Sequence, residues 1–117
     1  MSLNTTLVSA VEPIVPTVRP DLYQPAPGEN LDEWCTYNRA ESPRLHAGGA
    51  PRRIVYLYQL HYYLPLGRSP EAVLDALKKT VFTAGFTFPS AQDASDGDGQ
   101  HWVLEFEGAE AVDYGRV

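Results

Sequence analysis

The chain lacks several features that mark secreted and membrane proteins. It has one cysteine in 117 residues, which excludes an internal disulfide and a cysteine-based zinc site. A lone free thiol is typical of a reducing compartment, so we expect cytoplasmic synthesis. No basic segment of a signal peptide opens the chain, and no apolar run approaches the roughly 18 residues of a membrane span. The sequence therefore predicts neither secretion nor insertion in a membrane.

Positive charge is also scarce. Nine Lys and Arg stand against 15 Asp and Glu, giving a net charge of -6. Binding to nucleic-acid phosphates needs clustered basic residues, so this composition argues against a nucleic-acid-binding protein. With 44% hydrophobic and 21% charged residues, the chain is typical of a globular protein. Its length predicts one domain, residues 1–117.

Catalytic and metal-binding patterns are missing as well. His46, His61 and His101 have none of the spacings used by zinc sites. The run from Asp96 imitates a calcium loop but has His101 where that loop needs glycine. The glycine pairs lack the strand-to-helix context of a phosphate loop. We therefore expect no cofactor, no metal and no enzymatic activity.

The N-terminal half predicts a helix followed by irregular segments. Apolar residues recur at helical spacing over 4–15, with Asn4 as the expected N-cap and Pro13 ending or kinking the helix. The density of proline in 16–30 predicts an extended connector. Residues 33–38 predict a short strand. Residues 40–52, which contain Pro43, Pro51 and two glycines, predict a long flexible loop that projects from the domain and orders when a partner binds.

The C-terminal half predicts a strand, a helix and a second strand. Residues 54–64 and 100–107 both have the alternation and aromatic content of strands. Between them, Ser69 suits an N-cap, Pro70 the first helical position and Gly85 the left-handed position after a helix, which predicts a helix over 70–84. A short strand at 86–88 is optional, and 90–99 is expected to be a polar turn. The fold class is therefore α+β: a small, mainly antiparallel sheet packed by two helices, in the order α-β-β-α-(β)-β.

The strand 54–64 is apolar on both faces, because the residues at odd and at even positions are largely hydrophobic. One of these two faces can pack against the predicted helix. A chain of this length has few elements left for the other face, so a partner chain is the natural candidate. The tyrosines Tyr56, Tyr58, Tyr62 and Tyr63 favour core or interface packing, with stacking on a small ligand as the alternative.

Charge is distributed unevenly along the chain. A basic group surrounds the 40–52 segment, and an acidic stretch from Asp93 to Asp113 contains no Lys or Arg. These two groups are the candidate interface residues: Arg39, Arg44, His46, Arg52 and Arg53 on the basic side, and Asp93, Asp96, Asp98, Glu105, Glu107 and Glu110 on the acidic side. They predict head-to-tail assembly, in which the basic loop of one subunit meets the acidic region of the next.

Three stretches carry a resemblance to a known family. They are Tyr58–Gly67, Val81–Pro89 and Asp98–Glu107. The chain resembles small phage and prophage tail proteins, and is most similar to the tail-terminator, or tail-completion, type of long-tailed phages. The proline-rich connector and the glycine-rich 47–51 segment depart from that pattern.

The resemblance implies a structural, non-enzymatic virion protein. Such subunits assemble as a hexameric ring that caps the tail tube, ends its polymerisation and joins it to the head connector. The implied partners are further copies of the chain, a tail-tube protein and a head–tail connector protein, and DNA passes through the ring without specific binding. The implied location is the cytoplasm of the bacterial host during assembly and then the virion tail, with no membrane involved.

Two alternatives remain open. The first is a small-ligand-binding domain that uses the tyrosine-rich sheet face, which would be a monomer with a concave aromatic pocket. The second is a small cysteine-dependent enzyme, which requires Cys35 to be exposed beside His61 or His101.

Overall fold

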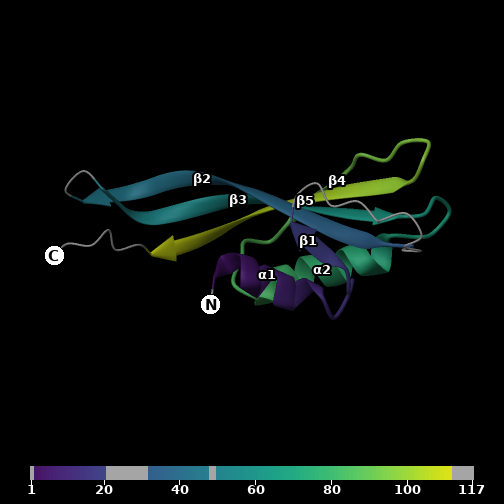
Figure 1. Ribbon diagram of the computed structural model, residues 1–117, viewed down its shortest axis with the longest axis horizontal. Helices are drawn as coiled ribbons and strands as arrows, with labels where there is room; N and C mark the ends of the chain where they lie inside the picture. The colour runs from purple at the N-terminus through teal and green to yellow at the C-terminus, as the bar shows by residue number, and fades with distance from the viewer. Residues whose placement is uncertain (1, 21–31, 48–49, 112–117) are drawn as a thin grey trace.

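The computed structural model describes residues 2–20, 32–47 and 50–111; for residues 42–47, 50–53 and 111 only the backbone is described. The elements in chain order are α1 (Leu3–Val11), β1 (Val18–Pro20), β2 (Trp34–Ala47), β3 (Ala50–Leu64), α2 (Glu71–Thr83), β4 (Ser90–Asp93) and β5 (Gln100–Ala111). Both helices lie against the same side of one sheet (Figure 1). The predicted α+β class with two packing helices is confirmed.

The sheet has five strands in the order β1-β2-β3-β5-β4. β1 pairs with β2 in parallel, and the other three pairs are antiparallel. The sheet is therefore mainly antiparallel, as predicted. Its register aligns Cys35, Tyr62 and Trp102 in one cross-strand row, and Thr36, His61 and Val103 in the next. Since successive residues of a strand alternate between faces, these two rows lie on opposite faces of the sheet.

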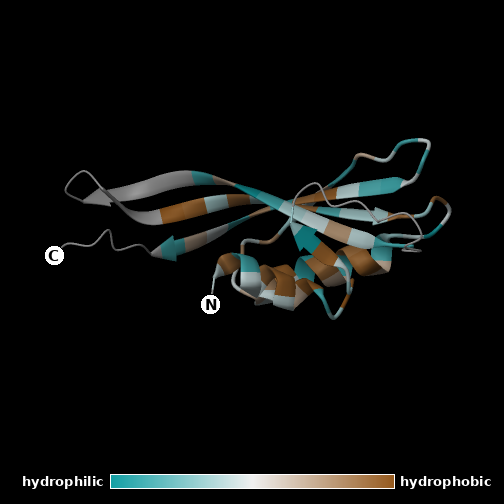
Figure 2. Cartoon of the chain, viewed as in Figure 1, coloured by the Kyte–Doolittle hydropathy of each residue, from teal (hydrophilic) through white to brown (hydrophobic). Residues whose placement is uncertain are grey.

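The hydrophobic core lies between the helices and one face of the sheet. On β3 that face carries Tyr56, Tyr58, Leu60, Tyr62 and Leu64, all at most 6% exposed. Leu7 and Val11 of α1 and Leu77 and Val81 of α2 are fully buried against it. The predicted packing of the second helix on strands 54–64 and 100–107 is confirmed. Figure 2 shows hydrophobic residues concentrated in the two helices and in β3, whereas β4 and its connection to β5 are mostly hydrophilic.

The helix boundaries differ from the predicted ones by a few residues. Ser2, rather than Asn4, caps α1, because its hydroxyl accepts the Thr5 amide at 3.1 Å. Asn4 instead accepts a hydrogen bond from the Tyr58 hydroxyl. α1 ends at Val11, two residues before Pro13, in accord with the missing proline amide. α2 begins at Glu71 with Pro70 as its N-cap, so the predicted Ser69 cap was wrong by one position. Gly85 has φ 110, which confirms its left-handed role.

The prediction of a loop at 40–52 was wrong for the described residues, which belong to strands, while their mobility stays a prediction. Strand β2 runs through to Ala47 and β3 starts at Ala50, with an antiparallel register that continues to the Ala47–Ala50 pair. The prolines are compatible with this ladder because each lies where one edge of its strand has no partner strand among the described residues: Pro43 beyond the end of β1, and Pro51 beyond the end of β5. A long cross-strand ladder thus outweighed the local turn signals.

Other segment predictions need smaller corrections. The strand predicted at 33–38 is the first part of the longer β2, and β5 continues beyond 107 to Ala111. Within the predicted connector, Val18–Pro20 forms β1; residues 21–30 lie outside the described part of the chain. The optional strand at 86–88 is not formed, although the Thr87 amide donates to the Glu107 carbonyl. β4 (Ser90–Asp93) forms one edge of the sheet and lies inside segment 90–99, which was predicted to be a polar turn.

The molecule is elongated because the central strands extend past the helices. We call residues 42–47 and 50–53 the arm. From Trp34 to the end of the arm at Ala47, β2 spans roughly 43 Å at about 3.3 Å per residue. The molecule measures 55 × 28 × 24 Å, and its radius of gyration of 16.1 Å exceeds the roughly 13 Å of a compact chain of this length. Figure 1 shows the arm at one end and the β4–β5 connection at the other.

Candidate functional site

The sheet face away from the helices is the candidate site, and we call it the open face. Its central row contains Asn38 of β2, Gln59 of β3 and Glu105 of β5. Leu57, which is 44% exposed, lies in the next row of this face toward the arm. At the end of the face far from the arm, one row contains Trp34, Tyr63 and His101. No described helix covers these side chains, so the open face presents aromatic, amide and carboxylate groups to the surroundings of the molecule.

An aromatic and histidine cluster occupies the end of the open face far from the arm. The ring of Tyr63 lies between Trp34, with centroids 5.0 Å apart, and His101, with centroids 4.4 Å apart, and both pairs are stacked. His61 joins the cluster through a contact of 2.8 Å between its Nδ1 and the Nε2 of His101. Cross-strand register alone brings these four rings together from three strands.

The histidine contact has room for one proton between its two nitrogens. His61 Nε2 lies 3.2 Å from Asn38 Oδ1, a carbonyl oxygen, so we assign the proton of neutral His61 to Nε2. His61 Nδ1 then accepts the proton carried by His101 Nε2. Burial lowers the pKa of His101, while the Asp96 carboxylate opposes that shift. The folded site therefore favours the neutral form of His101.

A pocket adjoins this cluster, and we call it the end pocket. It has a volume of about 410 Å³. Trp34, Tyr63 and His101 line one part of it, and Asp32, Asp96 and Asp98 supply carboxylates. Asp96 Oδ1 accepts the Asp98 amide at 2.9 Å, which fixes the turn that presents both carboxylates. The pocket thus combines stacked rings with three carboxylates, of which Asp32 lies 3.7 Å from Arg68, and the Asp96 and Asp98 carboxylates beside the rings suit a cation.

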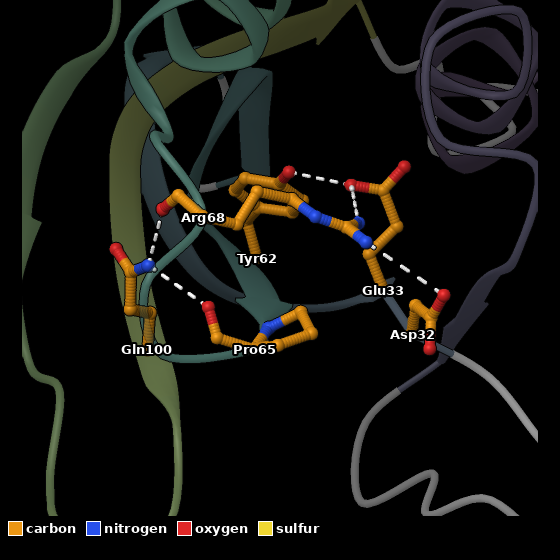
Figure 3. A network of polar contacts seen from close by, with 6 residues as sticks. All are labelled: Asp32, Glu33, Tyr62, Pro65, Arg68 and Gln100. Atoms are coloured by element: carbon orange, nitrogen blue, oxygen red, sulfur yellow. Dashed lines mark hydrogen bonds and ion pairs between the residues drawn. The ribbon is translucent and has the colours of Figure 1, made fainter.

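A polar network ties the elements beside the end pocket to one another (Figure 3). The Tyr62 hydroxyl donates to Glu33 Oε2 at 2.6 Å, and Arg68 lies 3.7 Å from Asp32 and 4.0 Å from Glu33. Gln100 Nε2 donates to the carbonyls of Pro65 and Arg68. Burial, followed by the hydrogen bond to Glu33, raises the pKa of Tyr62 well above its usual value, so its hydroxyl remains a donor. The network joins the starts of β2 and β5 to the end of β3.

A second hollow lies nearer the middle of the open face, and we call it the middle hollow. It is an open depression of about 730 Å³. Its lining includes Asn38, Ala40, Leu57, Gln59, Thr87, Glu105 and Glu107. The Asn38 and Gln59 side chains are 3.5 Å apart, and the Glu107 amide is held by the Thr87 hydroxyl at 2.8 Å. Arg39, Tyr58 and Phe106 also line it, so the hollow combines amide and carboxylate groups with an exposed leucine and an arginine.

The predicted basic group divides into two places. Arg39 belongs to the helix side of the sheet: its guanidinium donates to the Tyr58 hydroxyl at 3.2 Å and lies 4.0 Å from the centre of the Tyr56 ring. Arg44 and Arg53 sit opposite each other in the arm ladder, and His46 pairs with Pro51 beside Arg52. The side chains of these four arm residues lie outside the described part of the structure.

The predicted acidic group divides into three places. Asp96 and Asp98 line the end pocket, whereas Glu105 and Glu107 line the middle hollow. Glu110 is on the helix side, where its Oε1 accepts the Leu3 amide at 3.3 Å. Asp93, at the end of β4, accepts the Ser95 amide at 2.9 Å, and these hydrogen bonds with Ser95 lower its pKa. The acidic stretch is therefore not one surface.

The structure adds site residues that sequence patterns did not single out. Trp34 and Asp32 lie about 30 positions before Tyr63, and both were outside the predicted groups. The available signal was the antiparallel pairing of 33–38 with 54–64, which would place Trp34 beside Tyr63 if its register were known. Register depends on long-range pairing, so the composition of either strand alone does not reveal it.

The residues on which the two alternatives depended are in the core. Tyr56, Tyr58 and Tyr62 are at most 6% exposed, so the tyrosine-rich face packs against the helices, and Tyr63 is the tyrosine of 54–64 on the open face. Cys35 is fully buried in the row of Tyr62, on the face opposite His61 and His101. Burial, followed by the nearby Glu33 charge, raises the pKa of Cys35, which opposes formation of the thiolate. The exposed Cys35–His arrangement required for a cysteine enzyme is therefore not formed.

Two further kinds of site are absent from the described residues. In that part of the chain, His, Cys, Asp and Glu side chains do not gather in groups of three or more that could hold a metal ion. Among the described helices, α1 and α2 included, none has both the length and the apolar character needed to cross a bilayer.

Comparison with known proteins establishes the fold alone. No protein-family profile and no curated protein matches the chain. A solved structure whose name states no function is similar to it, with a TM-score of 0.60 and 17% sequence identity, over 97% of this chain and 92% of that one. The similarity covers nearly the full length of both chains, so the two proteins share an overall fold.

Proposed function

We propose that the chain is a structural tail protein of a phage or prophage, of the tail-terminator type. In this role its subunits form a ring, with six copies expected from the family resemblance. The ring caps the tail tube, ends its polymerisation and joins it to the head connector. Its partners are further copies of the chain, the tail-tube protein and the connector protein. The work of the ring takes place in the bacterial host cytoplasm and later in the virion.

The observation that carries this proposal is the opposite character of the two ends of an elongated subunit. The arm contributes three arginines and no acidic residue over residues 42–53. The other end carries the end pocket with Asp32, Asp96 and Asp98. Charges of opposite sign at opposite ends favour contacts between different surfaces of neighbouring copies, and such heterologous contacts close into rings when the rotation allows it.

The net charge also suits a ring that surrounds DNA. The chain carries -6, and a subunit that uses its arm arginines in contacts with neighbours leaves an acidic remainder. An acidic passage repels phosphate, so a duplex can move through it without being held. This passage function needs no base-specific or phosphate-specific contact.

The direct test is deletion of the gene in the phage or prophage that encodes the chain. We expect tails of uncontrolled length and heads that fail to join them, as seen by electron microscopy of lysates, with both defects restored by the wild-type gene. Normal tails of normal length in the deletion strain would refute the proposed function. A purified-protein test is electron microscopy for annular particles, with a mass near roughly six times the 13.0 kDa chain.

A second candidate function is binding of a small cationic ligand. The observation in its favour is the stack of Trp34 and Tyr63 beside the carboxylates of the end pocket. This candidate predicts a monomer that binds small guanidinium or ammonium compounds, with changes confined to the end pocket. It would be preferred over the ring if the gene deletion left tails unchanged and such binding were measured by calorimetry.

A further inference from the structure

We propose that the end pocket is the receptor for an arginine side chain from the arm of a second copy of the chain. The inference rests on the self-assembly in the proposed function and deepens it, because it names the two surfaces in contact. The donor is one of Arg44, Arg52 and Arg53. The receptor is formed by Trp34, Tyr63, Asp96 and Asp98, with Asp32 at its edge.

The two surfaces cannot meet within one molecule. In the β2–β3 ladder, Arg44 pairs with Arg53 near the end of the arm, while Trp34 pairs with Tyr63 at the opposite end. The ten residue steps from Trp34 to Arg44 span roughly 33 Å of straight strand. A strand paired along this length does not fold back on itself, so an arm arginine can enter an end pocket only in another copy.

The chemistry of the pocket selects a guanidinium. Tyr63 is stacked on both sides, by Trp34 at an interplanar angle of 15° and by His101 at 18°, so the flat faces that remain for a ligand are the outer ones of Trp34 and His101, which line the pocket. A guanidinium is planar, stacks on aromatic faces and donates two parallel hydrogen bonds to a carboxylate. Asp96 uses Oδ1 for the Asp98 amide, which leaves its Oδ2 and the Asp98 carboxylate as acceptors beyond that turn. An ammonium group would fit the charge but not the stacking.

The receptor is held in place before any partner arrives. Gln100 and Pro65, which line the pocket, are joined by a hydrogen bond of 3.0 Å, and Asp32 is held by Arg68 at 3.7 Å (Figure 3). His101, at the ring stack, donates its backbone amide to the Ser95 hydroxyl at 3.0 Å. A preformed receptor loses little conformational entropy on binding, which favours affinity from a small contact.

The other predicted interface residues fit this contact less well. Arg39 is engaged with Tyr58 and Tyr56 inside its own subunit, and Glu110 accepts the Leu3 amide there. Glu105 and Glu107 line the middle hollow, which contains amides and Leu57 but no exposed ring stack. Among the described acidic residues, Asp96 and Asp98, which line the end pocket together with the stacked rings, are therefore the best match for an arginine.

The test uses two variants, each with one altered end. The pocket variant carries Asp96→Lys and Asp98→Lys, and the arm variant carries Arg44→Glu, Arg52→Glu and Arg53→Glu. Light scattering coupled to size exclusion should show the wild type self-associating with rising concentration, and each variant alone should remain a monomer. Matched controls change exposed charges on α2, Asp75→Lys and Lys79→Glu, and should associate like the wild type. Circular dichroism establishes that every variant is folded.

Mixing the two variants gives the sharpest outcome. The pocket variant keeps an intact arm, and the arm variant keeps an intact pocket, so one productive contact is available between them. The mixture should associate although each variant alone does not, and any assembly larger than a dimer should be weaker than that of the wild type, because it needs the exchanged pair of a Glu arm and a Lys pocket. Combining all five substitutions in one chain exchanges the charges of both ends and should restore part of the self-association.

Replacing the three arm arginines with lysine separates stacking from charge. This variant retains the net charge, so long-range attraction is unchanged, but lysine has no planar group to lie on Trp34. We expect self-association at least tenfold weaker than that of the wild type. Equal association of the lysine variant would overturn the assignment of a guanidinium to the pocket.

Several results would overturn the head-to-tail contact. These are a wild type that stays monomeric at the highest soluble concentration, variants that associate as well as the controls, and a mixture of the two variants that stays monomeric although both are folded. Failure of the proposed function is distinguishable from these results. If the mixed variants associate but gene deletion leaves tail length unchanged, the contact stands and the tail-terminator role falls.

Discussion

The two faces of β3 differ far more in how much other elements of the chain cover them than in their amino-acid composition. On the helix side, Tyr58, Leu60 and Tyr62 are at most 1% exposed. On the open face, Leu57 is 44% exposed, and Gln59, His61 and Tyr63 are half-buried. Tyrosine occurs on both faces of the same strand. A tyrosine in an alternating strand therefore does not reveal which face is the core; the helices that the rest of the chain supplies decide it.

The largest expected contrast between the faces comes from truncating one leucine on each side. Leu77 of α2 is fully buried against the sheet, so Leu77→Ala should lower the free energy of unfolding by about 2 to 5 kcal/mol. Leu57→Ala on the open face should cost less than about 1 kcal/mol. Chemical denaturation of both variants measures the difference. Equal losses would mean that the open face is covered in the isolated protein.

Gly108 offers a second contrast, on the helix side of β5. A methyl group at this position would lie 2.7 Å from two ring atoms of Phe86, which is 3% exposed. Gly108→Ala should therefore destabilise the fold by about 1 to 3 kcal/mol through overpacking. Gly97 has nothing within 4 Å of the corresponding methyl position and does not have a positive φ, so Gly97→Ala is the matched control. A neutral Gly108→Ala would show that Phe86 moves freely.

Tyrosine hydroxyls provide a third contrast. The Tyr58 hydroxyl donates to Asn4 Oδ1 at 2.7 Å and accepts from Arg39 at 3.2 Å, so Tyr58→Phe leaves polar groups without that partner. We expect a loss of about 1 to 2 kcal/mol in thermal or chemical unfolding. Tyr63→Phe on the open face keeps the ring stack with Trp34 and His101 and should change stability by less than about 0.5 kcal/mol. The reverse order would contradict the assignment of Tyr58 to the core network.

The smallest expected effect is a pH dependence at the open face. His101 faces His61, Tyr63 and Asp96, and its pKa in the folded state is lowered mainly by burial. A lowered histidine pKa means that the unfolded chain binds more protons, so this contribution to stability is present above the unfolded pKa of about 6.5 and declines as pH falls below it. His101→Phe should reduce the fall in melting temperature between neutral and mildly acidic pH. An unchanged pH profile in that variant would refute the coupling.

The sequence predicted the core better than the surface. The helix 70–84 and the strands 54–64 and 100–107 were recognisable because the periodicity of each is local, and Gly85 has the conformation that its position predicted. The arm was missed because Pro43, Pro51 and two glycines are local turn signals, while the pairing that makes 42–47 and 50–53 strands is between residues of different segments. β4 was missed because its burial pattern is polar and its single partner, β5, is needed to define it.

The candidate site was predictable in charge but not in place. The contrast between a basic arm and an acidic C-terminal region can be read directly from the residues. Its division into separate surfaces depends on which residues share a face: Arg39 and Glu110 lie on the helix side, although their sequence neighbours lie on the other. Trp34 entered the site through its register with Tyr63, which no pattern within either strand specifies.

The order of the strands in the sheet has a consequence for the synthesis of the protein. β5, the last of the described strands, lies between β3 and β4, and β4 pairs with no other strand in the described structure. While a ribosome is still making residues 100–111, the edge of β3 that finally pairs with β5 has no partner strand. At that stage α2 also has only part of the surface on which it finally packs. The nascent chain exposes an apolar strand edge until this late stage, so folding is completed after β5 emerges. Interruption of translation before Ala111 would then release an adhesive fragment with an open edge rather than a smaller version of the domain.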